Sequence, residues 1–150
     1  MMASLLMKTQ RKKTLTTVSK TRVLVYGSLR KGMGNHRLLE GQDFVGETLT
    51  KEPYAMYSLG GFPMVSLEGD KVSPIVVEAY DVDDRGLARL NQLEGFHGKG
   101  QRNFYDCSHV ETVDHEGGLI YHIEGEASRP NPLVEDGNWV NYRKANQRYN

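Results

Sequence analysis

The sequence of 150 residues has almost no cysteine and no long apolar run. Cys107 is its single cysteine, so an internal disulfide is impossible and a small secreted domain held by disulfides is excluded. A reducing compartment is the default for such a chain, and we expect a cytoplasmic location. No stretch of about 18 apolar residues occurs, so the sequence predicts no membrane-spanning helix. The length suits one soluble globular domain with a core of its own.

The chain also lacks an excess of charge of one sign, with 19 basic and 19 acidic residues. The basic residues are unevenly placed, because residues 1–22 hold six of them and no acidic residue, which leaves 13 basic against 19 acidic in the remainder. A phosphate backbone would be repelled by this acidic body, so nucleic-acid binding is disfavoured outside the basic arm. We interpret residues 1–21 as a disordered arm, with an organelle transit peptide as the alternative, and residues 22–150 as a single domain.

Motifs for metal, phosphate or nucleophilic chemistry are missing. The five histidines show no metal-ligand spacing, and the pair Cys107 and His109 on one strand face has no further ligand nearby. The glycine patterns of phosphate and dinucleotide loops are absent, and no Gly-x-Ser-x-Gly elbow makes Ser28 a hydrolase nucleophile. The sequence therefore predicts no metal ion, and Cys107 is best interpreted as a buried structural thiol.

Short β-branched and aromatic runs, broken by glycine and proline, predict a chain dominated by strands. We expect strands at residues 23–26, 44–49, 54–59, 64–67, 75–82, 104–113 and 119–126. The last two strands pair as a hairpin across the turn at residues 114–118.

One segment carries a clear helical pattern. Leu87, Leu90 and Leu93 recur every three residues, Asp83 or Asp84 can cap the start, and Gly95 suits a left-handed C-terminal cap. A shorter helical stretch is expected at residues 36–40, and the tail from residue 127 is expected on the surface, anchored by Trp139. Many strands with few helices predict an α+β fold, a small mixed β-barrel with one or two flanking helices.

Two places have the chemistry of a site. The glycine-punctuated loop at residues 26–35 follows a buried strand, so its backbone N–H groups can face an anion, although a plain tight turn is the alternative. Glu94 ends the apolar-periodic helix, where partial burial would raise its pKa toward that of a general base. The alternative for Glu94 is a solvated surface glutamate.

A set of motifs in order resembles the gamma-glutamylcyclotransferase-like family, and most of all its gamma-glutamylamine cyclotransferase and AIG2-like branch. The resemblance covers about residues 22–142. The matching motifs are Val25-Tyr26-Gly27-Ser28-Leu29-Arg30-Lys31-Gly32 with Gly34-Asn35-His36, Tyr57-Ser58-Leu59-Gly60 with Phe62-Pro63, Val77-Glu78-Ala79-Tyr80-Asp81, Leu90-Asn91-Gln92-Leu93-Glu94-Gly95 and Asp136-Gly137-Asn138-Trp139.

The resemblance implies a barrel with a cavity and a reaction that needs no cofactor. In that reaction the α-amine of a γ-glutamyl compound attacks its own γ-carbonyl, which releases 5-oxoproline and an amine or amino acid. The resemblance makes Glu94 the catalytic acid and base. It assigns substrate binding to Tyr26, Gly27, Ser28, Leu29, Asn35 and Tyr105.

One departure from the family pattern concerns specificity. Members commonly carry Tyr-x-Arg shortly after the glutamate, whereas here Tyr105 is followed by Asp106 and Cys107. We hypothesise that Lys99 and Arg102, in the long loop before Tyr105, form a lid that supplies the missing charge. The alternatives are a cyclotransferase that deprotects a natural product and a non-catalytic binding or interaction module. The leaving group and the oligomeric state stay open.

Overall fold

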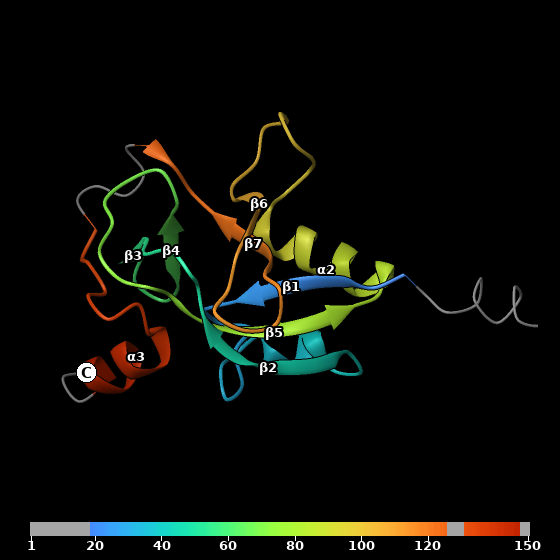
Figure 1. Cartoon of the computed structure of the whole chain (residues 1–150), viewed down its shortest axis with the longest axis horizontal. Helices are drawn as coiled ribbons and strands as arrows, with labels where there is room; N and C mark the ends of the chain where they lie inside the picture. Colours follow the sequence, from blue (N-terminus) through green and yellow to red (C-terminus); the bar gives the residue numbers. More distant parts are fainter. Residues whose placement is uncertain (1–18, 126–130, 148–150) are drawn as a thin grey trace, which may run out of the picture.

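The computed structural model describes residues 19–125 and 131–147 (Figure 1). The basic arm expected at residues 1–21 falls mostly outside this part of the chain. The first strand, β1 (Thr21–Val25), begins one residue before the predicted start of the domain.

Five strands form one mixed sheet in the order β2-β5-β1-β7-β6. Besides β1 these are β2 (Asp43–Leu49), β5 (Val76–Val82), β6 (Asp106–Val110) and β7 (Gly118–His122). The β1–β7 pair is parallel and the other pairs are antiparallel. The predicted hairpin is confirmed as β6–β7, although both strands are shorter than expected.

The sheet curls until its two edges meet. Just beyond β2 and β6, Lys51 N donates to Glu111 O at 2.9 Å and Val113 N donates to Leu49 O at 2.9 Å. A second, two-stranded sheet of β3 (Ala55–Ser58) and β4 (Pro63–Ser66) joins the barrel where Ile123 N donates to Val65 O at 3.0 Å. The predicted small mixed barrel is thereby confirmed.

Helix α2 (Asp84–Glu94) has the predicted caps. The Asp83 side chain accepts a hydrogen bond from Gly86 N, and Gly95 is left-handed with φ of 67°. Its apolar stripe is only partly buried: Leu90 is buried, but Leu93 is 41% exposed because α2 ends there, at the rim of a cavity. The stretch at residues 36–40 forms a four-residue 3-10 helix, η1 (His36–Leu39).

The described part of the C-terminal segment lies largely on the surface, as expected, and it contains a helix that was not predicted, α3 (Trp139–Gln147). Trp139 is fully buried, as the predicted anchor requires. The segment before it runs along the barrel, where Val134 N donates to Met56 O and Val76 N donates to Gly137 O. No periodic apolar pattern predicted α3, because its apolar contacts come mainly from Trp139 and the stacked Tyr142.

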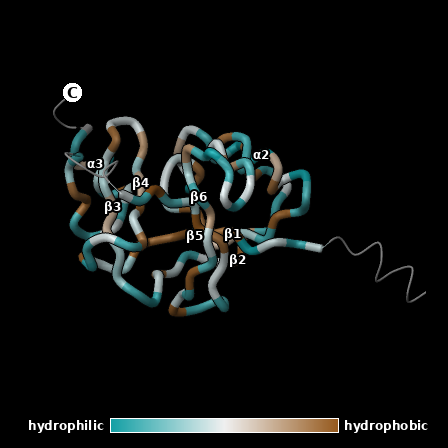
Figure 2. Tube along the Cα trace, turned by 90° about the horizontal axis from the view of Figure 1, so that it is seen from above, coloured by the Kyte–Doolittle hydropathy of each residue, from teal (hydrophilic) through white to brown (hydrophobic). Residues whose placement is uncertain are grey.

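The core consists of two apolar clusters on opposite faces of the sheet. Leu24 and Tyr26 belong to one cluster, whereas Val23 and Val25 belong to the other. This alternation follows from the two-residue period of a strand. Figure 2 shows hydrophobic stretches through the middle of the molecule, along β5, and hydrophilic loops around them. Within the described ranges, no helix has both the length and the apolar character needed to cross a membrane.

Candidate active site

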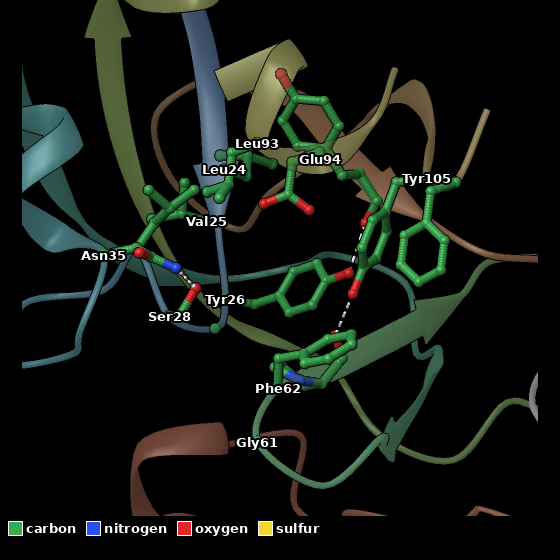
Figure 3. A pocket seen from close by; sticks show the side chains of 15 residues that line it. Leu24, Val25, Tyr26, Ser28, Asn35, Gly61, Phe62, Leu93, Glu94 and Tyr105 are labelled. Carbon is green, nitrogen blue, oxygen red and sulfur yellow. Dashed lines mark hydrogen bonds between the residues drawn. The ribbon is translucent and has the colours of Figure 1, made fainter. Parts of the chain in front are cut away.

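A cavity of about 360 Å³ opens beside the end of β1, and 15 residues line it (Figure 3). This volume suits a small molecule. Its wall contains every residue predicted to act in catalysis or substrate binding, although these are distant in the chain: Tyr26, Gly27, Ser28, Leu29, Asn35, Glu94 and Tyr105.

The loop after β1 forms one side of the cavity. A Cβ atom on Gly27 would come within 2.8 Å of the Pro63 ring, so only glycine allows this close packing. Asn35 holds Ser28 twice, because its backbone N donates to Ser28 O and its side-chain amide donates to Ser28 Oγ, both at 2.9 Å. No hydrogen bond among the described residues uses the N–H groups of Ser28 and Leu29. The loop therefore presents backbone donors to a ligand.

A buried ion pair lies beneath this loop. Arg30 Nε donates to Glu78 Oε2 at 2.8 Å, and the two residues are only 5% and 4% exposed. The guanidinium also binds Glu47 on β2 and Asn138 before α3, while Lys31 N donates to Glu78 Oε1 at 2.9 Å. Arg30 thus ties the loop to β5, β2 and the C-terminal segment. The sequence did not predict this role, although the acidic Glu78 among the mostly apolar residues of β5 was a signal for it.

Glu94 ends α2, and its carboxylate points into the cavity (Figure 3). Burial raises the pKa of Glu94 from 4.5 to about 7, and desolvation is the sole cause. The expected partial desolvation is therefore present. The pKa of the nearby Cys107 thiol rises to about 11, mainly through burial and further through the charge of Glu94. A neutral, free thiol fits the interpretation of Cys107 as structural.

Three tyrosine rings form the walls around Glu94. Tyr26 donates its hydroxyl to Tyr121 O at 2.6 Å, Tyr105 donates to Pro63 O at 2.7 Å, and Tyr121 donates to Asn91 Oδ1 at 2.6 Å. Each phenolic proton already has a protein acceptor. The rings therefore shape the cavity. Of the described residues that line it, Glu94 is the single one with a charged side chain.

Eight lining residues were not predicted as site residues: Leu24, Val25, Gly61, Phe62, Pro63, Leu93, Phe104 and Tyr121. Phe62 and Pro63 belong to a motif that carried the family resemblance, so a signal for them existed. Phe104 and Tyr121 had none, because their place at the cavity depends on how the barrel closes.

The hypothesised lid residues lie elsewhere. Lys99 and Arg102 are exposed and do not line the cavity. Their loop is closed on itself, since Asn103 Oδ1 accepts from His97 N at 2.6 Å and Asn103 Nδ2 donates to Gly98 O at 2.9 Å. Among the described residues, the cavity wall consequently contains no basic side chain.

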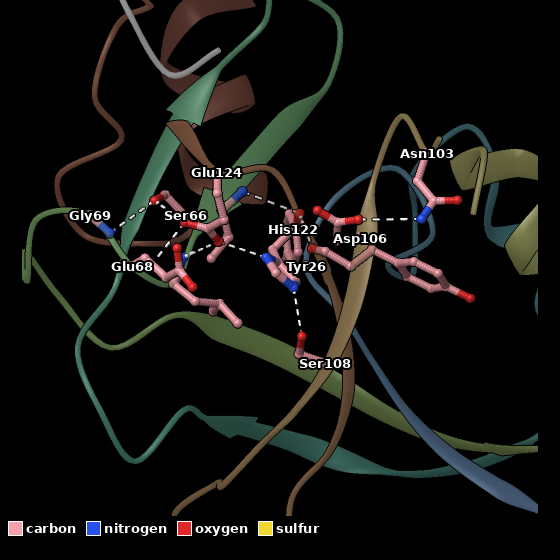
Figure 4. A network of polar contacts seen from close by, with 12 residues as sticks. Tyr26, Ser66, Glu68, Gly69, Asn103, Asp106, Ser108, His122 and Glu124 are labelled. Carbon is pink, nitrogen blue, oxygen red and sulfur yellow. Dashed lines mark hydrogen bonds and ion pairs between the residues drawn. The ribbon is translucent and has the colours of Figure 1, made fainter. Parts of the chain in front are cut away.

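A second polar cluster lies outside the cavity, around Glu124 (Figure 4). The carboxylate accepts hydrogen bonds from Leu67 N, Glu68 N, Ser66 Oγ and His122 Nδ1, and His122 Nε2 bonds Ser108 Oγ at 2.8 Å. These donors outweigh burial and lower the pKa of Glu124. The cluster joins β4 to β7. Across the described part of the chain, no three His, Cys, Asp or Glu side chains form a group that could hold a metal ion.

Comparison with known proteins agrees with this geometry. The family model described as "Gamma-glutamyl cyclotransferase, AIG2-like" matches residues 23–141. A Methanocaldococcus jannaschii protein, provisionally named a gamma-glutamylcyclotransferase, is 38% identical over 81% of this chain and 97% of its own length.

Two further relatives share the chain's sequence or fold. The gamma-L-glutamyl-butirosin B gamma-glutamyl cyclotransferase of Niallia circulans is 29% identical over 64% of this chain and 59% of its own. The crystal structure of an uncharacterised Pyrococcus horikoshii protein superposes with a TM-score of 0.66 at 25% identity, covering 86% of this chain and 98% of that one. The chain belongs to the AIG2-like gamma-glutamyl cyclotransferase family.

Proposed function

We propose that the protein converts a γ-glutamyl amine or γ-glutamyl amino acid into 5-oxoproline and the free amine, with Glu94 as general base and then general acid. One observation carries the proposal. The Glu94 carboxylate, with its pKa raised to about 7 by burial, faces a cavity whose opposite side is a loop with unused backbone donors. A base that titrates near neutral pH is suited to moving protons in both directions.

The loop after β1 would hold the glutamyl end of the substrate. The N–H groups of Ser28 and Leu29 can bind the α-carboxylate, because backbone donors in a glycine-containing turn form an anion cradle. Asn35 fixes the shape of this turn through Ser28. In Figure 3 Ser28 and Asn35 lie together on one side of the cavity, with Glu94 and the Tyr26 ring between them and Tyr105.

The reaction then runs through Glu94. Its carboxylate takes a proton from the substrate's α-ammonium, and the freed lone pair attacks the γ-carbonyl carbon to form the ring C–N bond. The tetrahedral intermediate collapses, and the bond to the departing nitrogen breaks as that nitrogen receives the proton from Glu94. The ring nitrogen, which became cationic when it attacked, then loses its surplus proton to Glu94, which passes it to the departing amine, so that the products are the neutral lactam and an ammonium ion. Atoms and charges balance, and Glu94 returns to its ionised state.

The remaining contribution of the protein is conformational. The nucleophile and the carbonyl belong to one molecule, so holding the bent conformer brings effective molarities of about 10⁵ M or more within reach. The rigid aromatic walls and the tethered loop suit this task. A cytoplasmic location and the absence of a required cofactor stay predictions.

The substrate of the Niallia circulans relative makes deprotection of a γ-glutamyl natural product a second candidate with the same chemistry. Only the leaving group differs between the two. A non-catalytic module would have no use for a desolvated carboxylate at this place, and the same experiment tests that alternative.

The test measures 5-oxoproline release from γ-glutamyl-alanine, ε-(γ-glutamyl)-lysine, a γ-glutamyl alkylamine and glutathione. We expect turnover of at least one substrate, and a loss of about 10²-fold or more in kcat/KM for Glu94→Gln. Glu52→Gln is the matched control, because Glu52 is exposed and lies away from the cavity. A folded protein that is silent on the whole panel, or equal activity in Glu94→Gln, would contradict the proposal.

A further inference from the structure

Three polar side chains at one end of the β6–β7 hairpin are joined by hydrogen bonds outside the cavity (Figure 4). Ser108 lies on β6, His122 ends β7, and Glu124 follows two residues later. Oγ of Ser108 is 2.8 Å from Nε2 of His122, and Nδ1 of the same ring is 2.6 Å from Oε2 of Glu124. A hydroxyl bonded to a histidine that a carboxylate orients is the arrangement of an activated serine nucleophile. We call these three residues the serine triad.

Strand pairing places the triad on one face of the hairpin. Ser108 pairs with Ile120, so His122 is its diagonal neighbour on β7. The neighbouring Cys107 points to the other face, where it packs in the same apolar cluster as Tyr121 of the cavity wall. The serine triad and the cavity therefore lie on opposite faces. No local sequence motif marks the triad, because its members meet only when the two strands pair.

The charge of Glu124 sets the direction of the proton transfer. Its lowered pKa keeps it ionised at neutral pH, and an ionised carboxylate only accepts hydrogen bonds. Nδ1 of His122 therefore carries a proton. In the neutral imidazole Nε2 is then the acceptor, so the Ser108 hydroxyl donates to it. His122 is thus oriented to take the proton of Ser108 when Oγ attacks an electrophile.

The nucleophile is accessible, whereas its partners are held in place. Ser108 is half-buried, but His122 is only 7% exposed. Two backbone N–H groups and the Ser66 hydroxyl already bind Glu124 to the end of β4. The strands β6 and β7 are already paired along their whole length. The bond between Ser108 and His122 is therefore not needed to join elements of the fold.

The backbone beside Ser108 offers a donor for a developing oxyanion. Strand β6 is the outer strand of the five-stranded sheet, and β7 is its neighbour there. The N–H groups of consecutive residues alternate in direction along an antiparallel strand, so either Ser108 N or His109 N points away from β7. A backbone N–H group next to the nucleophile is a common part of an oxyanion hole.

The charges next to the triad indicate which electrophile fits. Glu124 is bonded to His122, and Asp106 is the cross-strand partner of His122. Both side chains are acidic, so an anionic acyl group would be repelled at this place. An uncharged acyl group is therefore the better match.

We propose that the serine triad is a second catalytic site, which hydrolyses uncharged esters through an acyl-Ser108 intermediate. The proposal is independent of the reaction at Glu94, because the two sites share no residue. Ser108 is the nucleophile, His122 is the general base and then the general acid, and Glu124 holds the imidazole in the required orientation.

The reaction consumes one water molecule and passes through two tetrahedral intermediates. Oγ of Ser108 attacks the acyl carbon while Nε2 of His122 takes its proton, and the alcohol leaves with that proton. Water then attacks the acyl carbon and gives a proton to Nε2. The bond to Oγ breaks, and Oγ receives the proton from His122. The products are the alcohol and the carboxylic acid, and the triad returns to its first state.

Covalent labelling of the whole chain with an alkyl fluorophosphonate tests the nucleophile. Oγ displaces fluoride from phosphorus, and peptide mass spectrometry locates the adduct. Ser73 is the internal control, since it is also half-buried but donates to the carbonyl of Pro74 instead of a histidine. We expect Ser108 to react about 10²-fold or more faster than Ser73, and His122→Gln to remove about 10²-fold of that rate. Equal labelling of the two serines in the wild type would overturn the proposal, whatever the variant does.

Hydrolysis of p-nitrophenyl acetate tests the full cycle. We expect steady release of p-nitrophenolate that falls about 10²-fold or more in Ser108→Ala and is unchanged in Ser73→Ala. The anionic mono-p-nitrophenyl succinate should be hydrolysed with a kcat/KM about tenfold lower. Turnover that survives in Ser108→Ala would overturn the proposal. Labelling of Ser108 without steady turnover would overturn it too, because the acyl group would then not be released.

Discussion

At the scale of single residues, protonation of the Glu94 carboxylate affects both the stability of the fold and the activity of the protein. Its pKa of about 7 in the folded protein lies above the ordinary value of 4.5. Between these two values the folded state binds more protons than the unfolded state, so the free energy of unfolding falls as pH rises from about 4.5 to about 7 and then levels off. The proposed base, in contrast, is active only when ionised.

We therefore predict opposite pH profiles for the two properties. Below about pH 7, kcat/KM should fall about tenfold per pH unit. Glu94→Gln should lose activity yet gain about 1–3 kcal/mol of stability over the wild type at pH 8, and gain almost nothing at pH 4.5. Initial rates and urea unfolding across this range measure both. A gain in stability that is equal at both pH values, or that Glu52→Gln shares, would show that burial of the charge is not its cause.

At the scale of elements, the loop after β1 depends on the ion pair beneath it. Arg30→Met alone should destabilise the protein by about 3–5 kcal/mol, since it leaves Glu78 buried without its partner. Adding Glu78→Gln should recover most of that stability while retaining the bonds to Lys31 N and the Tyr80 hydroxyl. If Arg30 positions the loop, kcat/KM of the double variant should stay about tenfold or more below wild type, because small displacements of binding groups are costly for catalysis.

A second ion pair on the same sheet provides the control. Arg22 and Asp81 join β1 to β5 through Nε and Oδ1 at 2.6 Å, far from the cavity lining. The variant Arg22→Met with Asp81→Asn should change stability without changing kcat/KM. Full activity in the Arg30 and Glu78 double variant, or an equal loss of kcat/KM in the control variant, would mean that Arg30 stabilises the fold and does not position the loop.

The elements differ in how far the sequence alone could predict them. Helix α2 was predictable because its caps and apolar spacing are local features, and so were the strands with their two-residue alternation. Helix α3 was not, because its burial rests on Trp139 packing against residues far away in the chain. The role of Arg30 depends on partners 17, 48 and 108 residues away, which no local pattern specifies.

At the scale of the whole molecule, closure of the barrel assembles the cavity. Its lining comes from the loop after β1, the turn before β4, the end of α2 and the segment before β6. The site residues that form motifs, such as Glu94 and Ser28, could be predicted from the family resemblance. The exposed apolar residues at the cavity, Leu93 and Phe104, could not, since Leu93 looked like a core residue and Phe104 like the start of a strand. Both line the cavity because α2 ends and β6 begins beside it.

The C-terminal segment connects the two sheets, and this predicts that the barrel unfolds as one unit. Trp139 packs in the same apolar cluster as Leu24 of β1 and Met56 of β3, and Val134 pairs with Met56 through the backbone. The chain has one tryptophan, so its fluorescence reports on this segment alone, whereas far-UV circular dichroism reports on the sheets.

Urea unfolding followed by both signals should give coincident midpoints, as expected for a cooperative domain of this size. Trp139→Phe retains an aromatic ring and removes a buried indole N–H that has no hydrogen-bond partner among the described residues. It should therefore destabilise the protein less than Trp139→Ala, for which we expect about 3–5 kcal/mol. A fluorescence midpoint well below that of circular dichroism would instead show that α3 and the segment before it detach first. The tether from Asn138 to Arg30 would then be lost while the barrel persists, and activity should fall at the lower midpoint.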